Sequence, residues 1–367
     1  MKEKIYCEHC LKELTKETTY SFDGQKYCEE CLESLTVICD DCRERFLRRD
    51  DRHPSRHLCP SCFENHYNIC GRCSAVIHDN ECSYLDDYGD EPLCPECCDI
   101  VIRNRNIHDY CYRPEPVFYG DSSRYMGVEL EIDNGGENYD NAGLFLSVAN
   151  EKREHIYCKH DGSLEDGFEI VTHPMSLDYH MNHMPWKSLL DRIISHSYLS
   201  HQAETCGLHV HVSRKALGDT YEEQETTIAR ILYFFEMHWN ELLRFSRRTS
   251  EQLKRWANRY GYREQPSELL DYAKRRNGTA RYCCVNLQNA HTVEFRIFRG
   301  TLRYNTLIAT LQLVDRICEV AKYLSDDELK ELSWSTFVSG CHYPELIQYL
   351  KERRLYVNDA VSGEEEM

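Results

Sequence analysis

Four short segments of the chain alternate apolar and polar residues with a period of two, the period of a β-strand with two different faces. These segments are YMGVELEID (125–133), GFEIVTHP (167–174), CGLHVHVS (206–213) and TVEFRIFRG (292–300). In CGLHVHVS, His209 and His211 lie on one face, and the leucine and valines beside them lie on the other. The pattern predicts four strands that each bury one face in a core.

The polar faces of these strands carry mostly acidic and imidazole side chains. They present Glu129 and Glu131, Glu169, His209 and His211, and Glu294 with Arg296. A solvated strand face would favour lysine, threonine and mixed charges, although two histidines on a strand, taken alone, could simply be solvated. Several neighbouring carboxylates would repel one another unless cations lay among them, and oxygen-rich ligand sets suit Mg²⁺ or Mn²⁺. Because arginine holds phosphate oxygens bidentately, the combination predicts a nucleotide triphosphate site with bridging metal ions.

Three longer segments have apolar residues at helical spacing. They are 185–199, with Pro185 at its start, 222–246 and 305–324. The apolar stripe in 222–246 indicates a helix that faces the core and no cofactor site. Strands and helices together predict an α+β fold, with a mostly antiparallel sheet, helices on one of its faces and a polar site on the other.

The first hundred residues follow a different pattern, in which pairs of cysteines recur as CxxC. Twelve of the 21 cysteines form six such pairs, and the repeat period is 32 and then 31 residues. Within a repeat, 17, 16 or 20 residues separate the two pairs, which is the spacing of a tetrahedral zinc site with four thiolates. The predicted ligands of the three zinc ions are Cys7, Cys10, Cys28 and Cys31; Cys39, Cys42, Cys59 and Cys62; and Cys70, Cys73, Cys94 and Cys97.

Each repeat resembles a small treble-clef or LIM-like zinc module, and the three modules are expected at residues 1–35, 36–66 and 67–112. So short a unit cannot bury enough apolar surface alone, so metal binding is expected to provide its folding free energy. Pairing between adjacent repeats stays open. If one ligand is different, the substitutes are Cys82, Cys98, His9, His57 and His66.

Charge disfavours nucleic acid as the partner of these modules. The chain has a net charge of -18, and residues 1–112 carry 14 Lys and Arg against 23 Asp and Glu. Such a surface repels phosphate backbones at long range. The basic stretch 42–56 keeps RNA contact as a minor alternative to docking of a protein or a purely structural role. The acidic tail, 351–367, is interpreted as solubilising charge.

A cytoplasmic location is expected. The composition, 41% hydrophobic and 29% charged residues, is that of a soluble globular protein. The sequence contains no apolar run long enough to cross a bilayer, and its start lacks the apolar region of a signal peptide. Zinc-bound thiolates also require a reducing compartment.

Four motifs in the second part of the chain resemble a known family. GVELEI, HDGSL followed by FEIVTHP, GLHVHVS and TVEFRIFRGT, in that order, are similar to the amidoligases, which are glutamine-synthetase-like and glutamate–cysteine-ligase-like carboxylate–amine ligases. The resemblance covers residues 120–325 and does not reach the zinc modules, so a catalytic domain is expected at 118–350. It implies the mostly antiparallel sheet of that superfamily.

The resemblance also implies roles for individual residues. Metal ligands would be Glu129, Glu131, Glu169, His209 and Glu294, with help from Asp161. His211 would lie near the nucleotide phosphates, Arg296 would hold phosphate, and Arg281 and Asn286 would be further nucleotide contacts. Arg299 has the opposite strand parity, so it would reach the nucleotide only if a bulge or bend intervened.

The implied reaction uses ATP to convert a carboxylate into an acyl phosphate, which an amine attacks to form an amide or isopeptide bond. The substrates would be an amine and a carboxylate, which a peptide or protein could carry, and the chain could form an oligomer. Two other interpretations stay open: a zinc-finger adaptor whose ligase-like domain binds nucleotide without turnover, and a metal-dependent nuclease that uses the same carboxylates.

Overall fold

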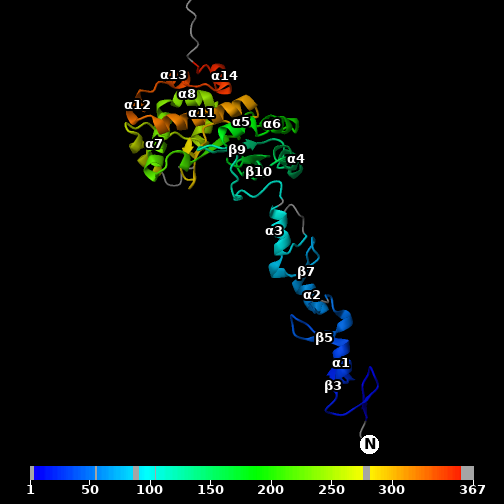
Figure 1. Cartoon of the computed structure of the whole chain (residues 1–367). Coiled ribbons are helices and arrows are strands. Elements are labelled where there is room, and N and C mark those ends of the chain that lie inside the picture. Colours follow the sequence, from blue (N-terminus) through cyan, green and yellow to red (C-terminus); the bar gives the residue numbers. More distant parts are fainter. Residues whose placement is uncertain (1–3, 54–55, 86–90, 104, 276–281, 357–367) are drawn as a thin grey trace, which may run out of the picture. The chain divides into compact units, whose positions relative to one another are not determined.

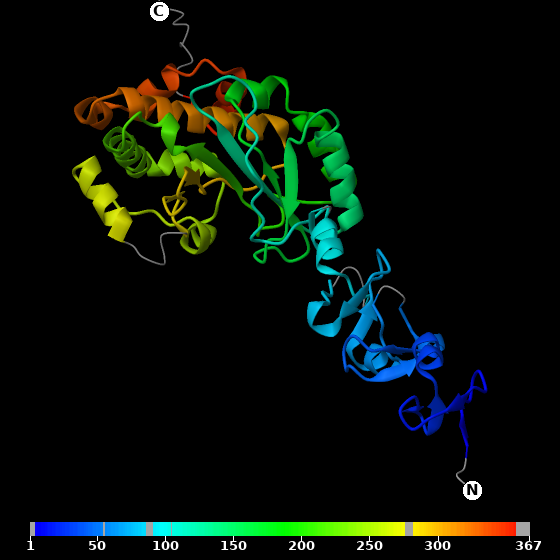
Figure 2. The ribbon, with the colours of Figure 1, turned by 60° about the horizontal axis from the view of Figure 1, so that its bottom comes forward.

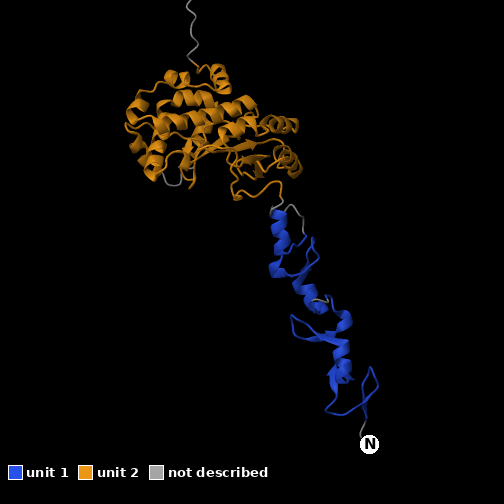
Figure 3. Ribbon diagram, in the orientation of Figure 1, with its two compact units in different colours: residues 1–104 blue, residues 105–367 orange. Residues whose placement is uncertain are grey.

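The computed structural model describes residues 4–53, 56–85, 91–103, 105–275 and 282–356. The chain divides into two compact units, Met1–Asn104 and Arg105–Met367 (Figure 3). Residues 105–112, predicted as part of the third module, belong to the second unit. No helix in the described ranges combines the length and the apolar character that a bilayer span needs.

The first unit contains three small modules that follow the cysteine repeats. Their elements are β1 (Ile5–Tyr6), β2 (Glu13–Leu14), β3 (Tyr20–Phe22), β4 (Gln25–Tyr27) and α1 (Glu29–Leu35); β5 (Thr36–Ile38), β6 (Arg45–Leu47) and α2 (Pro60–His66); and β7 (Tyr67–Ile69), β8 (Val76–His78) and α3 (Pro95–Arg103). In each module the first CxxC lies in the turn of an antiparallel hairpin, and the second CxxC begins a helix. Proline at the first helical position helps to start α2.

The sheet of the second unit has six strands in the order β10-β11-β9-β12-β14-β13, and each neighbouring pair is antiparallel. The strands are β9 (Met126–Ile132), β10 (Ile156–Lys159), β11 (Phe168–Thr172), β12 (Leu208–Ser213), β13 (Val285–Asn286) and β14 (Thr292–Phe295). The four central strands are those predicted from the alternating pattern. The two edge strands were not predicted, because they are short and do not alternate clearly between apolar and polar residues.

Helices cover the apolar face of this sheet (Figures 1 and 2). The helices of this unit in the described ranges are α4 (Tyr139–Ala149), α5 (Leu177–Asn182), α6 (Trp186–Ser195), α7 (Tyr221–Met237), α8 (Trp239–Ser246), α9 (Ser250–Trp256), α10 (Pro266–Arg275), α11 (Tyr304–Tyr323), α12 (Asp326–Glu331), α13 (Trp334–Ser339) and α14 (Pro344–Glu352). Of these, α9 contributes Trp256 to the cavity on the polar face. Side chains such as Val128, Val210 and Phe295 are fully buried beneath them. The predicted α+β fold with helices on one face is therefore confirmed.

The predicted helix at 222–246 is two helices, α7 and α8. Thr220 and Glu223 form a reciprocal capping box that starts α7. The helix ends at His238, which leaves the helical conformation with φ −110° and ψ 30°. The His238 ring packs against Phe234 and Trp334, with ring centroids 4.5 and 5.7 Å apart. The apolar stripe continues across the break, so the sequence pattern alone did not reveal it.

Candidate active site and zinc modules

The twelve predicted zinc ligands form three groups of four cysteines, one group per module, with the predicted membership. Across the two pairs, the sulfur atoms of Cys10 and Cys28 lie 3.8 Å apart, as do those of Cys73 and Cys94. A tetrahedron with Zn–S bonds of about 2.3 Å has edges of about 3.8 Å. The geometry of the thiol groups thus fits structural zinc. The predicted substitutes Cys82 and Cys98 pack in the small core of the third module instead.

Backbone amides favour thiolates at the first cysteine of each module. The N–H groups of Cys28, Cys59 and Cys94 donate to the sulfur atoms of Cys7, Cys39 and Cys70, each over 3.4 Å. Burial would raise the pKa of these thiols, but the backbone N–H donors outweigh it and lower the pKa of Cys7 and Cys70 to about 6 and that of Cys39 to about 7. Because the thiolate is the metal-binding form, the first cysteine of each module is suited to bind a divalent metal ion near neutral pH.

The strand register of the second unit brings the polar residues of the four central strands onto one face. Glu169 of β11 lies opposite Glu131 of β9, and His209 of β12 lies opposite Glu129. His211 lies opposite Glu294 of β14. A one-residue shift in any pairing would turn a whole strand's polar side chains into the core. The apolar core therefore enforces the convergence of these groups.

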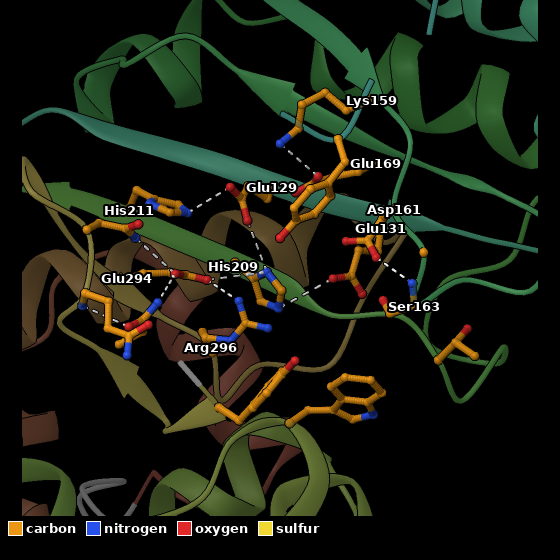
Figure 4. A pocket seen from close by; sticks show the side chains of 18 of the residues that line it. Glu129, Glu131, Lys159, Asp161, Ser163, Glu169, His209, His211, Glu294 and Arg296 are labelled. Atoms are coloured by element: carbon orange, nitrogen blue, oxygen red, sulfur yellow. Dashed lines mark hydrogen bonds and ion pairs between the residues drawn. The ribbon is translucent and has the colours of Figure 1, made fainter. Parts of the chain in front are cut away.

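These side chains line a cavity of about 800 Å³ (Figure 4). Nine predicted residues line it: Glu129, Glu131, Asp161, Glu169, His209, His211, Asn286, Glu294 and Arg296. Arg281 lies outside the described residues. Arg299, predicted as a nucleotide contact, is described but does not line the cavity, which agrees with its strand parity, opposite to that of Glu294 and Arg296.

One compact donor group lies on the β12–β14 side of the cavity. Ligand atoms of Glu129, His211 and Glu294 lie within 4.8 Å of one another. The Nε2 atom of His211 is 3.1 Å from a Glu129 oxygen. Thr292 and Asn286 support the group, since the Thr292 hydroxyl lies 3.2 Å from His211 Nδ1 and Asn286 Nδ2 donates to Glu294 over 2.7 Å.

His209 lies between this group and the other carboxylates (Figure 4). Its Nδ1 atom is 3.2 Å from Glu129 and 3.8 Å from Glu294, and its Nε2 atom is 3.6 Å from Glu131. The assignment of His209 to metal and His211 to phosphate stays a prediction. The geometry makes both imidazoles candidates for the ion, and it is His211 that belongs to the compact group.

The two sides of the cavity differ in electrostatics. Burial alone would raise the pKa of Glu129, but the His211 and His209 rings lower it well below its ordinary value. Likewise, His211 and Arg296 together outweigh burial and lower the pKa of Glu294. On the β10–β11 side, burial and the charge of Glu129 raise the pKa of Glu169 well above its ordinary value, even though Lys159 Nζ lies 3.3 Å away.

Several cavity residues were not found from the sequence. Lys159 lies on the edge strand β10, and Arg248 lies in the connection between α8 and α9. Tyr110, Trp256 and Tyr282 also line the cavity. Lys159 could have been suspected, because it directly precedes HDGSL. The others carry no local signal, since nothing in their sequence neighbourhood shows that the fold returns them to the sheet.

Residues 147–318 match the model of a family described as "Putative amidoligase enzyme". The predicted resemblance to amidoligases is thereby confirmed, and it supports a ligase-type function. The matched segment contains β10, β11, β12, β13 and β14, while β9 precedes it and pairs with β11 and β12 in the same sheet. The amidoligase-like segment therefore needs β9 to complete its polar face.

Comparison with solved structures finds a bifunctional glutathione synthetase from Pasteurella multocida, with 14% sequence identity and a TM-score of 0.35. The alignment covers 63% of this chain and 46% of the synthetase chain, so this chain spans less than half of that protein's length. No curated protein matches the chain.

Proposed function

We propose that the second unit is an ATP-dependent carboxylate–amine ligase that forms an amide or isopeptide bond through an acyl phosphate. The observation that carries the proposal is the gathering of four glutamates, two histidines and an arginine around one cavity, in and beside the segment that matches the amidoligase family. Three of the glutamates are nearly inaccessible to solvent. Buried carboxylates at this density are costly unless cations join them.

The donor set suits a hard divalent cation. Glu129 and Glu294 offer carboxylate oxygens, and His211 offers one imidazole nitrogen. Glu131, Glu169 and Asp161 are the residues that would hold a second ion. When bound, Mg²⁺ or Mn²⁺ would offset the negative charge of the phosphoryl group that is transferred.

The chain's own residues would orient the substrates and stabilise charge. Arg296 lies beside Glu294 on the cavity wall, where its guanidinium can hold phosphoryl oxygens. A substrate carboxylate oxygen would attack the γ-phosphorus of ATP, and ADP would leave. A neutral amine would then attack the acyl carbon, and inorganic phosphate and a proton would leave as the amide forms.

The zinc modules are proposed to bind a protein or peptide. The acidic balance of this region suits a basic partner and opposes nucleic acid. The hairpins and helices of the modules are stabilised by metal, so they can present side chains without a large apolar core.

Release of phosphate from ATP tests the proposal. Wild type should release phosphate with Mg²⁺ in the presence of a pool of amines and carboxylates, and mass spectrometry should find a product lighter by one water than its two substrates. Glu294→Gln should lower the rate by about 100-fold or more, because a neutral amide binds the cation poorly. Glu222→Gln, a change at an exposed residue of α7, is the matched control and should keep the wild-type rate.

Two results would contradict the proposal. Nucleotide binding without phosphate release across the whole pool would favour the adaptor. Cleavage of an oligonucleotide without ATP would favour the nuclease.

A further inference from the structure

Arg248 is a buried cation that has no carboxylate partner among the residues that the structure describes. Arg248 is only 7% exposed, and it lines the cavity. Its Nε atom donates to the carbonyl oxygen of Phe298 over 3.2 Å. In the described part of the chain, no Asp or Glu oxygen lies within 4.0 Å of a guanidinium nitrogen of Arg248. The guanidinium groups of Arg124, Arg259 and Arg296, by contrast, each form an ion pair with a carboxylate.

Charges of both signs act on Arg248. Burial and the charges of Arg296 and Arg299 lower the pKa of Arg248, whereas Glu131 acts in the opposite direction. The Nε atoms of Arg296 and Arg299 are themselves buried without a hydrogen-bond partner. The guanidinium of Arg248 is buried, and no carboxylate of the described residues pairs with it, so its burial costs free energy unless an anion joins it in the cavity.

The position of Gly207 shows where Arg248 points. A Cβ atom at Gly207 would lie 2.5 Å from Arg248 Nη2 and 2.6 Å from His209 Nε2. The guanidinium and the imidazole therefore both lie directly over Gly207, on the polar face of the sheet. The backbone N–H of the same glycine donates to Glu131. Arg248 thus reaches the cavity wall beside His209 from a connection between two helices.

We propose that Arg248, together with Arg296, forms a binding site for an oxyanion of the substrates next to His209. The oxyanion is either a phosphate group or a substrate carboxylate, since both present paired oxygens to a guanidinium. The inference deepens the proposed ligase function and rests on it for the identity of the anion, but not for the existence of the site.

The test compares the full-length wild type with Arg248→Met and Arg248→Lys. Inorganic phosphate and succinate serve as probes, and the rise in Tm with increasing probe concentration measures the apparent affinity. Arg230→Met is the matched control, because Arg230 pairs with Asp326 on the helical side of the unit.

Arg248→Met should weaken binding of one probe by about tenfold or more, and Arg248→Lys should bind it with intermediate strength, because lysine keeps the charge but loses the paired donors. If Arg248→Met loses affinity for phosphate alone, the site binds the phosphoryl oxygens. If it loses affinity for succinate alone, the site binds a substrate carboxylate. Equal binding by wild type and Arg248→Met, or binding of neither probe by wild type, would overturn the site.

Stability without probe separates this role from a structural one. The Tm of Arg248→Met should equal or exceed that of wild type, because the change removes a buried charge without a counterion. A lower Tm with unchanged probe affinity would mean that Arg248 serves only to bind Phe298, and would overturn the proposal.

Parallel phosphate-release assays keep the two proposals distinct. If wild type binds the probe through Arg248 but never consumes ATP, the anion site is supported and the ligase proposal is contradicted. If Arg248→Met consumes ATP and binds the probe as wild type does, the ligase proposal is supported and the anion site is contradicted.

Discussion

The two units of the chain differ in what fills their interiors. In the first module the buried core is Leu14 with three cysteines, and the other two modules have similarly small, cysteine-rich clusters. The second unit instead has one continuous core of aliphatic and aromatic side chains beneath its sheet. The first unit should therefore depend on metal for folding, while the second should fold without metal and carry its polar site as a preformed face.

Removal of zinc should break the first unit and spare the second, and this is the largest effect expected. Structural zinc provides about 10–16 kcal/mol of apparent binding free energy in small modules. Metal analysis should find about three zinc ions per chain, one per cysteine group. A strong chelator should then make residues 4–103 sensitive to protease and leave 105–356 resistant. An absence of zinc, or disulfides between the CxxC pairs, would remove this contrast between the units.

A substitution that opens a cavity in the core should instead destabilise the second unit and leave the first unit unchanged. Phe145 of α4 is fully buried and packs against Phe168 and Tyr198. Phe145→Ala should lower the free energy of unfolding of the second unit by about 3–5 kcal/mol, because it removes buried contacts and leaves a void.

The zinc content of the same variant should not change. Leu144→Ala, at an exposed position of the same helix, is the control and should have a much smaller effect. Denaturant unfolding measures both variants. Loss of zinc from Phe145→Ala would show that the units are coupled and not independent.

Acid should destabilise the second unit through His180. Burial lowers the pKa of His180 from 6.5 to about 4, although a hydrogen bond with the carbonyl of Met126 opposes the shift. The unfolded chain binds the proton first, so the stability that neutral His180 provides is present above pH 6.5 and is lost as the pH falls toward 4. The expected loss by pH 4 is about 3 kcal/mol.

His180→Gln should flatten this dependence, and the free energy of unfolding should be measured in urea at each pH. His183→Gln, at an exposed residue just beyond the same helix, should keep the wild-type slope. An identical slope in His180→Gln would show that other groups cause the acid sensitivity.

The smallest effect concerns the two histidines of β12. If the group formed by Glu129, His211 and Glu294 holds the ion, His211→Ala should raise the Mg²⁺ concentration needed for ATP turnover by about tenfold more than His209→Ala does. Metal titrations at fixed ATP measure this difference. The reverse order would support the assignment that the motif resemblance implies, with His209 as the metal ligand.

Much of the fold could be predicted from particular residues. The alternation around Glu129, Glu169, His209 and Glu294 located the four central strands and their polar face. The break at His238 could not be predicted, because an apolar stripe continues across it. Strand β13 has only two residues, and β10 does not alternate clearly between apolar and polar residues, so neither was predicted. Arg299 does not line the cavity, and its strand parity, opposite to that of Glu294 and Arg296, already indicated this.

The sequence by itself determined everything that depends on neighbours along the chain. Four cysteines within one repeat meet because the hairpin and helix between them are short, and alternating residues share a face because of the geometry of a strand. Tertiary structure alone decided which polar groups meet across strands. The register pairs His211 with Glu294, and the return of a helical connection places Arg248 over Gly207. The physical reason is that register and helix packing are selected by burial of the whole apolar core, which no local spacing encodes.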